Sequence, residues 1–220
     1  MAYVSTDRVA ATGTPGNERL RALGMVPLGA AVWTSAGRLA DDGIEAIVHA
    51  ASGAMRQTGD GFDPTRGSIT ACIQNALALA EAHGHRRLAL PFIAGGIFAD
   101  RIEPAIDKAE LAALIVQACE TAPASVEPVL VAHADADRSL FEAALAHQRD
   151  TRTRLLQGSL TDFALHGARA IVNAANMEVV FGGGISGVIG KATGDPAAIE
   201  AEAAEAIAEF WAANPPPGVG

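Results

Sequence analysis

The sequence is poor in the features that mark secreted, membrane-spanning and nucleic-acid-binding proteins. It has two cysteines, too few for a disulfide framework, so we expect buried thiols in a reducing, cytoplasmic compartment. Its apolar runs fall far short of the roughly 20 residues that span a bilayer, so we expect no membrane helix. The first residues lack a basic-then-apolar signal pattern. The net charge of −9 disfavours nonspecific nucleic-acid binding, although backbone N–H groups can still hold a small anion.

The chain nevertheless has enough apolar residues for a sizeable core, because half of its 220 residues are hydrophobic. This length allows one large or two small domains. Segments of strand-like and helix-like pattern alternate along the chain. We expect strands at residues 29–34, 44–51, 87–92, 128–132, 154–157 and 168–172, and helices at 68–83, 104–120, 136–147 and 195–213. Ser68 is expected to cap the first helix, and the solvated face of the last is expected to consist of Glu200, Glu202, Glu205 and Glu209.

The histidines do not suggest a metal site. His49 lies inside an apolar run, where a histidine is usually a hydrogen-bonded core residue. His83 and His85 lie at the end of a predicted helix without an evident third ligand, so we interpret them as a solvated helix end. We therefore expect neither a metal ion nor a cofactor.

One stretch, residues 170–187, has the pattern of a ligand-binding loop. A short apolar strand leads to Asn173 and Asn176, and three consecutive glycines, 182–184, precede a predicted helix. Glycines leave no side chains between the backbone and a ligand, so their N–H groups can face an anion together with the positive end of the helix. The alternative interpretation is a tight turn capped by asparagines.

Two familiar phosphate motifs do not fit this stretch. Gly182, Gly184 and Gly187 match the spacing of the dinucleotide fingerprint. That fingerprint needs a second strand after its helix, whereas here a helical segment and then a proline-rich end follow. A P-loop would need glycine at Ile185 and serine or threonine at Ala192. A nicotinamide-dependent dehydrogenase is therefore disfavoured.

The same stretch resembles the signature "VNAAN…GGGVxG" of the macrodomain family. Val172–Asn176 and Gly182–Gly187 carry the match, Lys191–Gly194 continues it, and Gly158–Thr161 resembles the family's "GDIT" element. The resemblance implies a three-layer α/β/α sandwich with a mixed sheet that binds ADP-ribose or ADP-ribosylated protein. We expect a monomer.

A second glycine loop, residues 93–99, resembles the family's "ISTGIYG" phosphate loop. Its alternative interpretation is a strand-to-helix turn with a core phenylalanine. Together the two loops and the "GDIT"-like element imply ligand-binding roles for Ser159, Leu160, Asn173, Gly182, Gly183, Gly184, Ile185, Ser186, Ala94, Gly95, Gly96, Ile97 and Phe98.

The order of the motifs is reversed relative to the family. The second-loop half occupies residues 25–147 and the first-loop half residues 151–213, and each half holds what the other lacks. We interpret this as circular permutation of a single domain spanning 25–220, with residues 1–24 as an N-terminal extension. Such rearrangements are tolerated at exposed loops between nearby termini.

Two departures from the family bear on function. The family's adenine-binding Asp is Ser159 here, and Asp162 or Asp135 could take its place. The Asp that some members use in hydrolysis is Ser186 here. Asn176 then becomes the best catalytic candidate, because it can position the distal ribose and a water. We predict a hydrolase that removes ADP-ribosyl groups from proteins or small ADP-ribose derivatives; the alternative is a non-catalytic ADP-ribose reader.

Overall fold

The computed structural model describes residues 17–55, 62–95, 102, 105–148 and 151–215. Its strands form one mixed sheet in the order β1-β2-β7-β4-β5-β6, with β3 paired to β2. The strands are β1 (Ala31–Ser35), β2 (Ala46–Met55), β3 (Phe62–Pro64), β4 (Arg87–Leu90), β5 (Glu127–Ala132), β6 (Arg154–Gln157) and β7 (Ala170–Asn176). Strands β2, β7, β4, β5 and β6 run parallel, whereas β1 and β3 pair antiparallel with β2.

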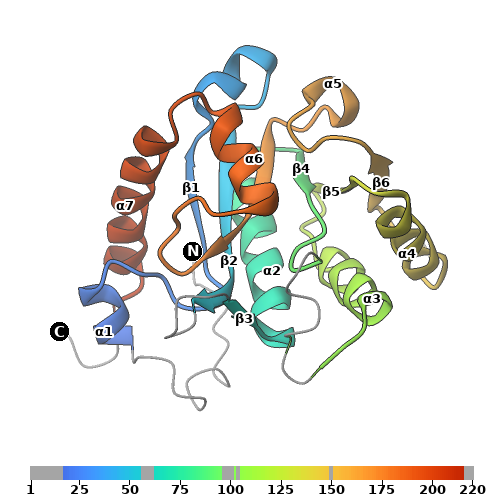
Figure 1. Ribbon diagram of the computed structural model, residues 1–220, viewed down its shortest axis with the longest axis horizontal. Helices are drawn as coiled ribbons and strands as arrows, with labels where there is room; N and C mark the ends of the chain where they lie inside the picture. Colours follow the sequence, from blue (N-terminus) through green and yellow to red (C-terminus); the bar gives the residue numbers. More distant parts are fainter. Residues whose placement is uncertain (1–16, 56–61, 96–101, 103–104, 149–150, 216–220) are drawn as a thin grey trace.

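Helices cover both faces of this sheet and make the three layers that the sequence predicted (Figure 1). One face packs against α2 (Arg66–Ala82), α3 (Lys108–Cys119) and α4 (Asp135–Ala146). The other packs against α5 (Phe163–His166), α6 (Gly184–Ala192), α7 (Pro196–Ala213), the short helix η2 (Gly37–Asp42) and α1 (Asn17–Ala22). Side chains alternate between the faces along each strand: Val48 joins the first core and Ile47 the second. No helix in the described segments is long and apolar enough to cross a membrane.

The two halves of the chain share this sheet. Strand β7, from the C-terminal half, lies between β2 and β4, from the N-terminal half. Its register with β2 pairs Asn173 with His49. Helix α7 also packs against β1 and α1, where Trp211 Nε1 donates to the carbonyl of Met25 at 2.7 Å. The hydrophobic core therefore depends on residues from both ends of the sequence.

The cap of α2 differs from the sequence prediction. Helix α2 begins at Arg66 with Thr65 as its N-cap, and Ser68 lies three residues further along. Thr65 Oγ1 accepts the backbone N–H of Ser68, and the N–H of Thr65 donates to Ser68 Oγ, both at 2.9 Å. Ser68 therefore completes a capping box instead of providing the cap itself.

Two glutamates on α7 also differ from prediction. Glu205 and Glu209 are exposed as expected, but Glu200 and Glu202 are half-buried. Glu202 accepts hydrogen bonds from the backbone N–H and hydroxyl of Ser35, both at 2.8 Å. Glu200 accepts one from the backbone N–H of Phe181 at 2.8 Å. These carboxylates satisfy backbone donors at a strand end and in the loop before α6, which helical periodicity cannot reveal.

The prediction that both cysteines are buried thiols is confirmed. Cys72 and Cys119 are free and buried. Burial raises the pKa of the Cys72 thiol to about 12 and raises the pKa of the Cys119 thiol as well. Both thiols therefore remain protonated and unreactive at neutral pH.

Candidate functional site

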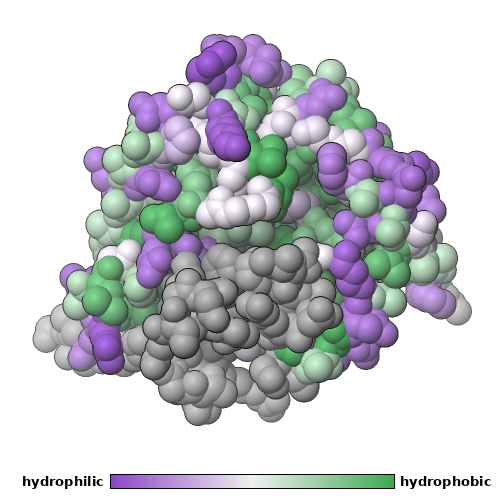
Figure 2. Space-filling model, viewed as in Figure 1, coloured by the Kyte–Doolittle hydropathy of each residue, from purple (hydrophilic) through white to green (hydrophobic). Residues whose placement is uncertain are grey.

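A cavity of about 780 Å³ lies at the carboxyl ends of the parallel strands. Ligands of open α/β sheets bind at this edge, where loops follow the strands. Its walls come from the carboxyl end of β2, from Pro64 of β3, from the segments after β4, β5, β6 and β7, and from the start of α3 and α4. Figure 2 shows weakly polar and hydrophobic residues gathered over α6 and the loop before it. Val180 and Val188, which line the cavity there, are both exposed.

The three glycines form one wall of this cavity. Gly182, Gly183 and Gly184 are exposed, and a Cβ atom added at any of them would meet nothing within 4 Å. Gly184 has a φ of 61°, a conformation that favours glycine. Gly183 is the N-cap of α6 and makes no side-chain capping bond. The first N–H groups of a nine-residue helix therefore lie at the cavity without a capping side chain.

Asn176 also lines the cavity, at the carboxyl end of β7. Its side chain is buried, and its Oδ1 accepts the backbone N–H of Val180 at 3.2 Å. This bond uses the carbonyl side of the amide and leaves the amide nitrogen as the group for a ligand. Asn176 therefore acts toward the cavity as a hydrogen-bond donor.

Asn173 does not line the cavity, although the family resemblance implied a ligand contact. It lies inside β7, which continues to Asn176 instead of ending at Val172. Its Nδ2 lies 3.1 Å from Nδ1 of His49, and His49 Nε2 lies 2.9 Å from Thr34 Oγ1. The prediction that His49 is a hydrogen-bonded core residue is confirmed. Burial lowers the pKa of His49 to about 3, so this ring is neutral at physiological pH.

Ser186 supports the loop from the first turn of α6. It is 6% exposed, and its Oγ accepts the backbone N–H of Gly182 at 3.2 Å. Its hydroxyl hydrogen remains able to donate toward the cavity that it lines. Ile185 lines the same wall. The polar groups around the glycines are thus amide and hydroxyl donors, which suits an anionic ligand.

The second predicted loop reaches the cavity through Ala94 and Gly95. The other three residues implied there, Gly96, Ile97 and Phe98, lie outside the described residues. Ala94 has a φ of 58°, and Val179, in the loop before the glycines, has a φ of 57°. Left-handed backbone is costly for alanine and especially for a β-branched valine, and such strain concentrates at functional sites.

The far end of the cavity lies over β5 and β6. Gly158, Ser159 and Leu160 line it, as the resemblance implied. Asp162 and Asp135 do not: Asp162 caps α5, and Asp135 accepts the side-chain amide of Gln157.

Sequence reasoning missed several residues at this end. Asp137 is the one carboxylate among the described residues that line the cavity, and its Oδ1 accepts a hydrogen bond from Lys108 Nζ at 2.9 Å. Lys108 Nζ also lies 5.4 Å from the centre of the Phe92 ring. This end of the cavity therefore combines an aromatic face with one ion pair.

The family model named Macro domain matches residues 4–109. The chain belongs to the macrodomain family. The match covers just under half of the chain, including β4 and the 93–99 loop. The macrodomain signature at 170–187 lies outside the matched residues, so it is a separate observation. No curated protein matches this macrodomain. Members of the family bind ADP-ribose.

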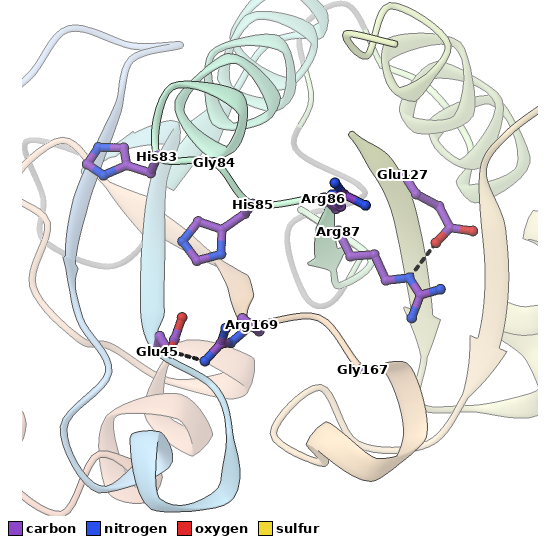
Figure 3. Close-up of a pocket in the computed structure, with 9 residues that line it drawn as sticks. All are labelled: Glu45, His83, Gly84, His85, Arg86, Arg87, Glu127, Gly167 and Arg169. Atoms are coloured by element: carbon purple, nitrogen blue, oxygen red, sulfur yellow. Dashed lines mark hydrogen bonds and ion pairs between the residues drawn. The ribbon is translucent and has the colours of Figure 1, made fainter. Parts of the chain in front are cut away.

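A second cavity of about 720 Å³ lies at the opposite, amino-terminal ends of the macrodomain's parallel strands (Figure 3). Its side chains are largely paired with each other. Arg87 Nε lies 2.5 Å from Glu127, and Arg169 pairs with Glu45. His83, predicted to be solvated, is exposed and stacks on Trp33 with ring centres 4.1 Å apart. No metal-binding group of three or more His, Cys, Asp or Glu residues occurs in the described part of the chain.

Proposed function

We propose that this macrodomain binds ADP-ribose in the 780 Å³ cavity and removes ADP-ribosyl groups from proteins or small ADP-ribose derivatives. The observation that carries the proposal is the uncapped start of α6 at three side-chain-free glycines. Backbone N–H groups in this arrangement attract a diphosphate without needing basic side chains. This explains how a chain of net charge −9 can bind an anionic ligand.

The cavity has the size and lining of a small-molecule site. Its volume falls within the roughly 300–1,000 Å³ typical of ligand pockets. Hydrophobic walls and a few placed donors also match that pattern. A diphosphate over Gly182–Gly184 places one ribose beside Asn176 and the nucleoside toward β5 and β6.

We propose that Asn176 holds the distal ribose for attack by water. Its amide nitrogen donates to a ribose hydroxyl, because its oxygen is bound to Val180 N–H. Hydrolysis forms a bond from the water oxygen to the anomeric or acyl carbon and breaks the bond to the leaving group. An amide is too weak a base to take the water's proton, so a phosphate oxygen of the ligand assists and the rate is modest.

A reader without catalysis is the second candidate. It is favoured by the hydrogen-bond donors around the glycines and by the pairing of Asp137, the one carboxylate among the described residues that line the cavity. Asp137 lies on α4 and is paired with Lys108, which makes it a poor base at the ribose. A binding module needs no base, and the same donors would serve it equally well.

Two measurements test the proposal. Calorimetric titration with ADP-ribose, AMP and NAD measures the binding step, and ADP-ribose is expected to bind most tightly. Release of ADP-ribose from an ADP-ribosylated protein under single-turnover conditions measures catalysis. Release above the buffer rate supports the hydrolase. Tight binding without release supports the reader, and no binding of ADP-ribose contradicts both.

We also propose that the two halves are the exchanged parts of one permuted domain in the cytoplasm. The end of α7 lies beside α1, so the chain's described ends are near each other (Figure 1). Trp211 bonding to the carbonyl of Met25 supports the same view. Buried, unpaired cysteines suit a reducing compartment.

A further inference from the structure

The end of the cavity over β5 and β6, here named the base end, has apolar walls against which a flat ring can pack. Phe92, Val131 and Leu160 supply apolar surface, and Gly158 and Ser159 complete it. A ligand with its diphosphate over the glycine loop of β7 extends across β4 toward this end, because the strands lie in the order β7-β4-β5-β6. The inference below rests on the proposed function.

Ser159 presents a hydroxyl at the base end with an adjustable hydrogen-bonding character. Its Oγ lies 2.9 Å from Thr161 Oγ1, and either hydroxyl can be the donor. Ser159 Oγ also accepts the backbone N–H of Thr161 at 3.3 Å. A hydroxyl has one hydrogen and two lone pairs, so these two bonds leave either its hydrogen or one lone pair free for a ligand.

Whether the hydrogen or a lone pair of Ser159 is free depends on which of the two hydroxyls donates. When Thr161 donates to Ser159, both lone pairs of Ser159 are used and its hydrogen is free to donate to a ligand. When Ser159 donates to Thr161, its hydrogen is used and one lone pair is free to accept. Rotation of two hydroxyl groups therefore converts the base end from a donor to an acceptor without moving any heavy atom.

The second polar pair at the base end, Lys108 and Asp137, can donate and accept hydrogen bonds at the same time. Lys108 Nζ donates to Asp137 Oδ1 at 2.9 Å. The other carboxylate oxygen of Asp137 can still accept, and the remaining ammonium hydrogens of Lys108 can still donate. Both residues line the cavity. Neither polar pair at the base end is restricted to accepting hydrogen bonds, as an unpaired carboxylate would be.

We propose that this cavity accepts purine diphosphoriboses with either adenine or hypoxanthine as the base. Adenine presents an amino donor beside a ring-nitrogen acceptor, and hypoxanthine presents a carbonyl acceptor beside a ring N–H donor. By reversing its hydrogen bond, the Ser159–Thr161 pair can accept from the adenine amino group or donate to the hypoxanthine carbonyl. Selection then comes from the diphosphate, the ribose and the apolar walls of the base end.

Calorimetric titration of the full chain with ADP-ribose and with its hypoxanthine analogue tests this inference. We expect the two dissociation constants to agree within about threefold, since each base finds a partner at a similar net cost. Adenine preference of more than about tenfold overturns the inference and leaves the proposed function standing. Failure of both ligands to bind contradicts the proposed function itself.

Two variants test whether Ser159 is the group responsible. Ser159→Asp keeps an acceptor for the Thr161 N–H but faces the exocyclic group of the base with acceptors alone. It can accept from the adenine amino group but cannot donate to the hypoxanthine carbonyl, so the hypoxanthine ligand should lose about tenfold while the adenine ligand keeps its affinity. Ser159→Ala should weaken both ligands equally. Melting temperatures close to wild type establish that the variants are folded. A folded Ser159→Asp variant that still binds both ligands alike overturns the role of Ser159.

Discussion

The side-chain oxygen of Asn176 accepts the backbone N–H of Val180 at 3.2 Å, and this bond orients the amide of a residue that lines the cavity. Val180 lies two residues before the first glycine of the loop, next to Val179 with its left-handed backbone. One amide therefore both holds the path of the loop and offers a donor to the ligand.

Substitution of Asn176 by alanine should lower turnover much more than ADP-ribose affinity. Misplacing a ribose by about 1 Å can cost on the order of a hundredfold in rate. Ser186→Ala should have a smaller effect, because Ser186 contacts the backbone of Gly182. The measurement is single-turnover release of ADP-ribose from a glutamate-modified protein. Equal release by wild type and Asn176→Ala would remove Asn176 from the mechanism.

Asn176→Asp provides a matched comparison for the direction of that bond. An aspartate can still accept the Val180 N–H, but it presents a negatively charged acceptor where asparagine presents a donor. The ADP-ribose affinity of this variant should fall by at least about tenfold, since a hydrogen bond is replaced by repulsion. Wild-type affinity in the Asn176→Asp variant would mean that the amide nitrogen does not contact the ligand.

Substitution of Gly183 by glutamate should largely abolish ADP-ribose binding while the fold survives. The added Cβ meets no atom within 4 Å, so the protein itself accommodates a side chain. A carboxylate there repels the diphosphate. Gly183→Ala is the control, because the φ of −84° suits alanine and the charge is absent. Titration measures binding, and thermal melting measures folding. Unchanged ADP-ribose affinity in a folded Gly183→Glu variant would mean that the loop is only a turn and does not hold the diphosphate.

Rejoining the halves in the reverse order should preserve the domain. The rearranged chain begins at Thr151, links Pro215 to Asn17 through a short flexible linker and ends at Gln148. Because Trp211 already contacts Met25, the new link spans neighbouring segments. We expect one cooperative unfolding transition and wild-type ADP-ribose affinity. The separate halves, 1–147 and 151–220, should be insoluble or unfolded. Two independently folding halves would contradict the permutation.

His49 should make the protein less stable as the pH falls below neutrality. Burial lowers its pKa from 6.5 to about 3. Between these values the unfolded chain binds a proton that the folded chain does not, so the unfolding free energy falls by up to about 1.4 kcal/mol per pH unit. The pKa values of His85 and His166 are also lowered by burial and add in the same direction.

Comparison with His49→Gln isolates this contribution, because glutamine keeps a donor and an acceptor but does not titrate. Urea unfolding of both proteins at pH 4.5 and pH 6.5 gives, for each protein, the slope of the unfolding free energy against pH. The contributions of His85 and His166 cancel in the difference between them. The wild-type slope should be the steeper one. Equal slopes would show that His49 is protonated in the folded protein or does not titrate in this range.

The sequence predicted the parts of the site that depend on local pattern. The glycine run was recognised because an exposed backbone requires glycine, and the segment around Ser159 was recognised by its resemblance to the "GDIT" element of the family. Helix α7 was predicted to within one residue of its observed bounds, because a proline suits the first turn of a helix. The extension of β7 to Asn176 was missed, since asparagine is uncommon in strands and only pairing with β2 makes the segment extended.

The missed residues depend on contacts between distant segments. Lys108 and Asp137 belong to different helices, and their pairing follows from how α3 packs beside α4. Glu200 has the sequence pattern of an ordinary surface residue, and only the fold brings the loop before α6 against it. No periodicity within one element contains this information, because these partners meet through the tertiary fold.

The central position of β7 has a consequence for biosynthesis. β7 is the last strand among the described residues, yet it fills the middle of the sheet between β2 and β4. Both neighbours have unpaired backbone edges until it leaves the ribosome, and such edges pair readily with other chains. The nascent protein thus carries an open gap in its sheet until β7 emerges, and a product truncated before β7 would expose the backbone edges of β2 and β4.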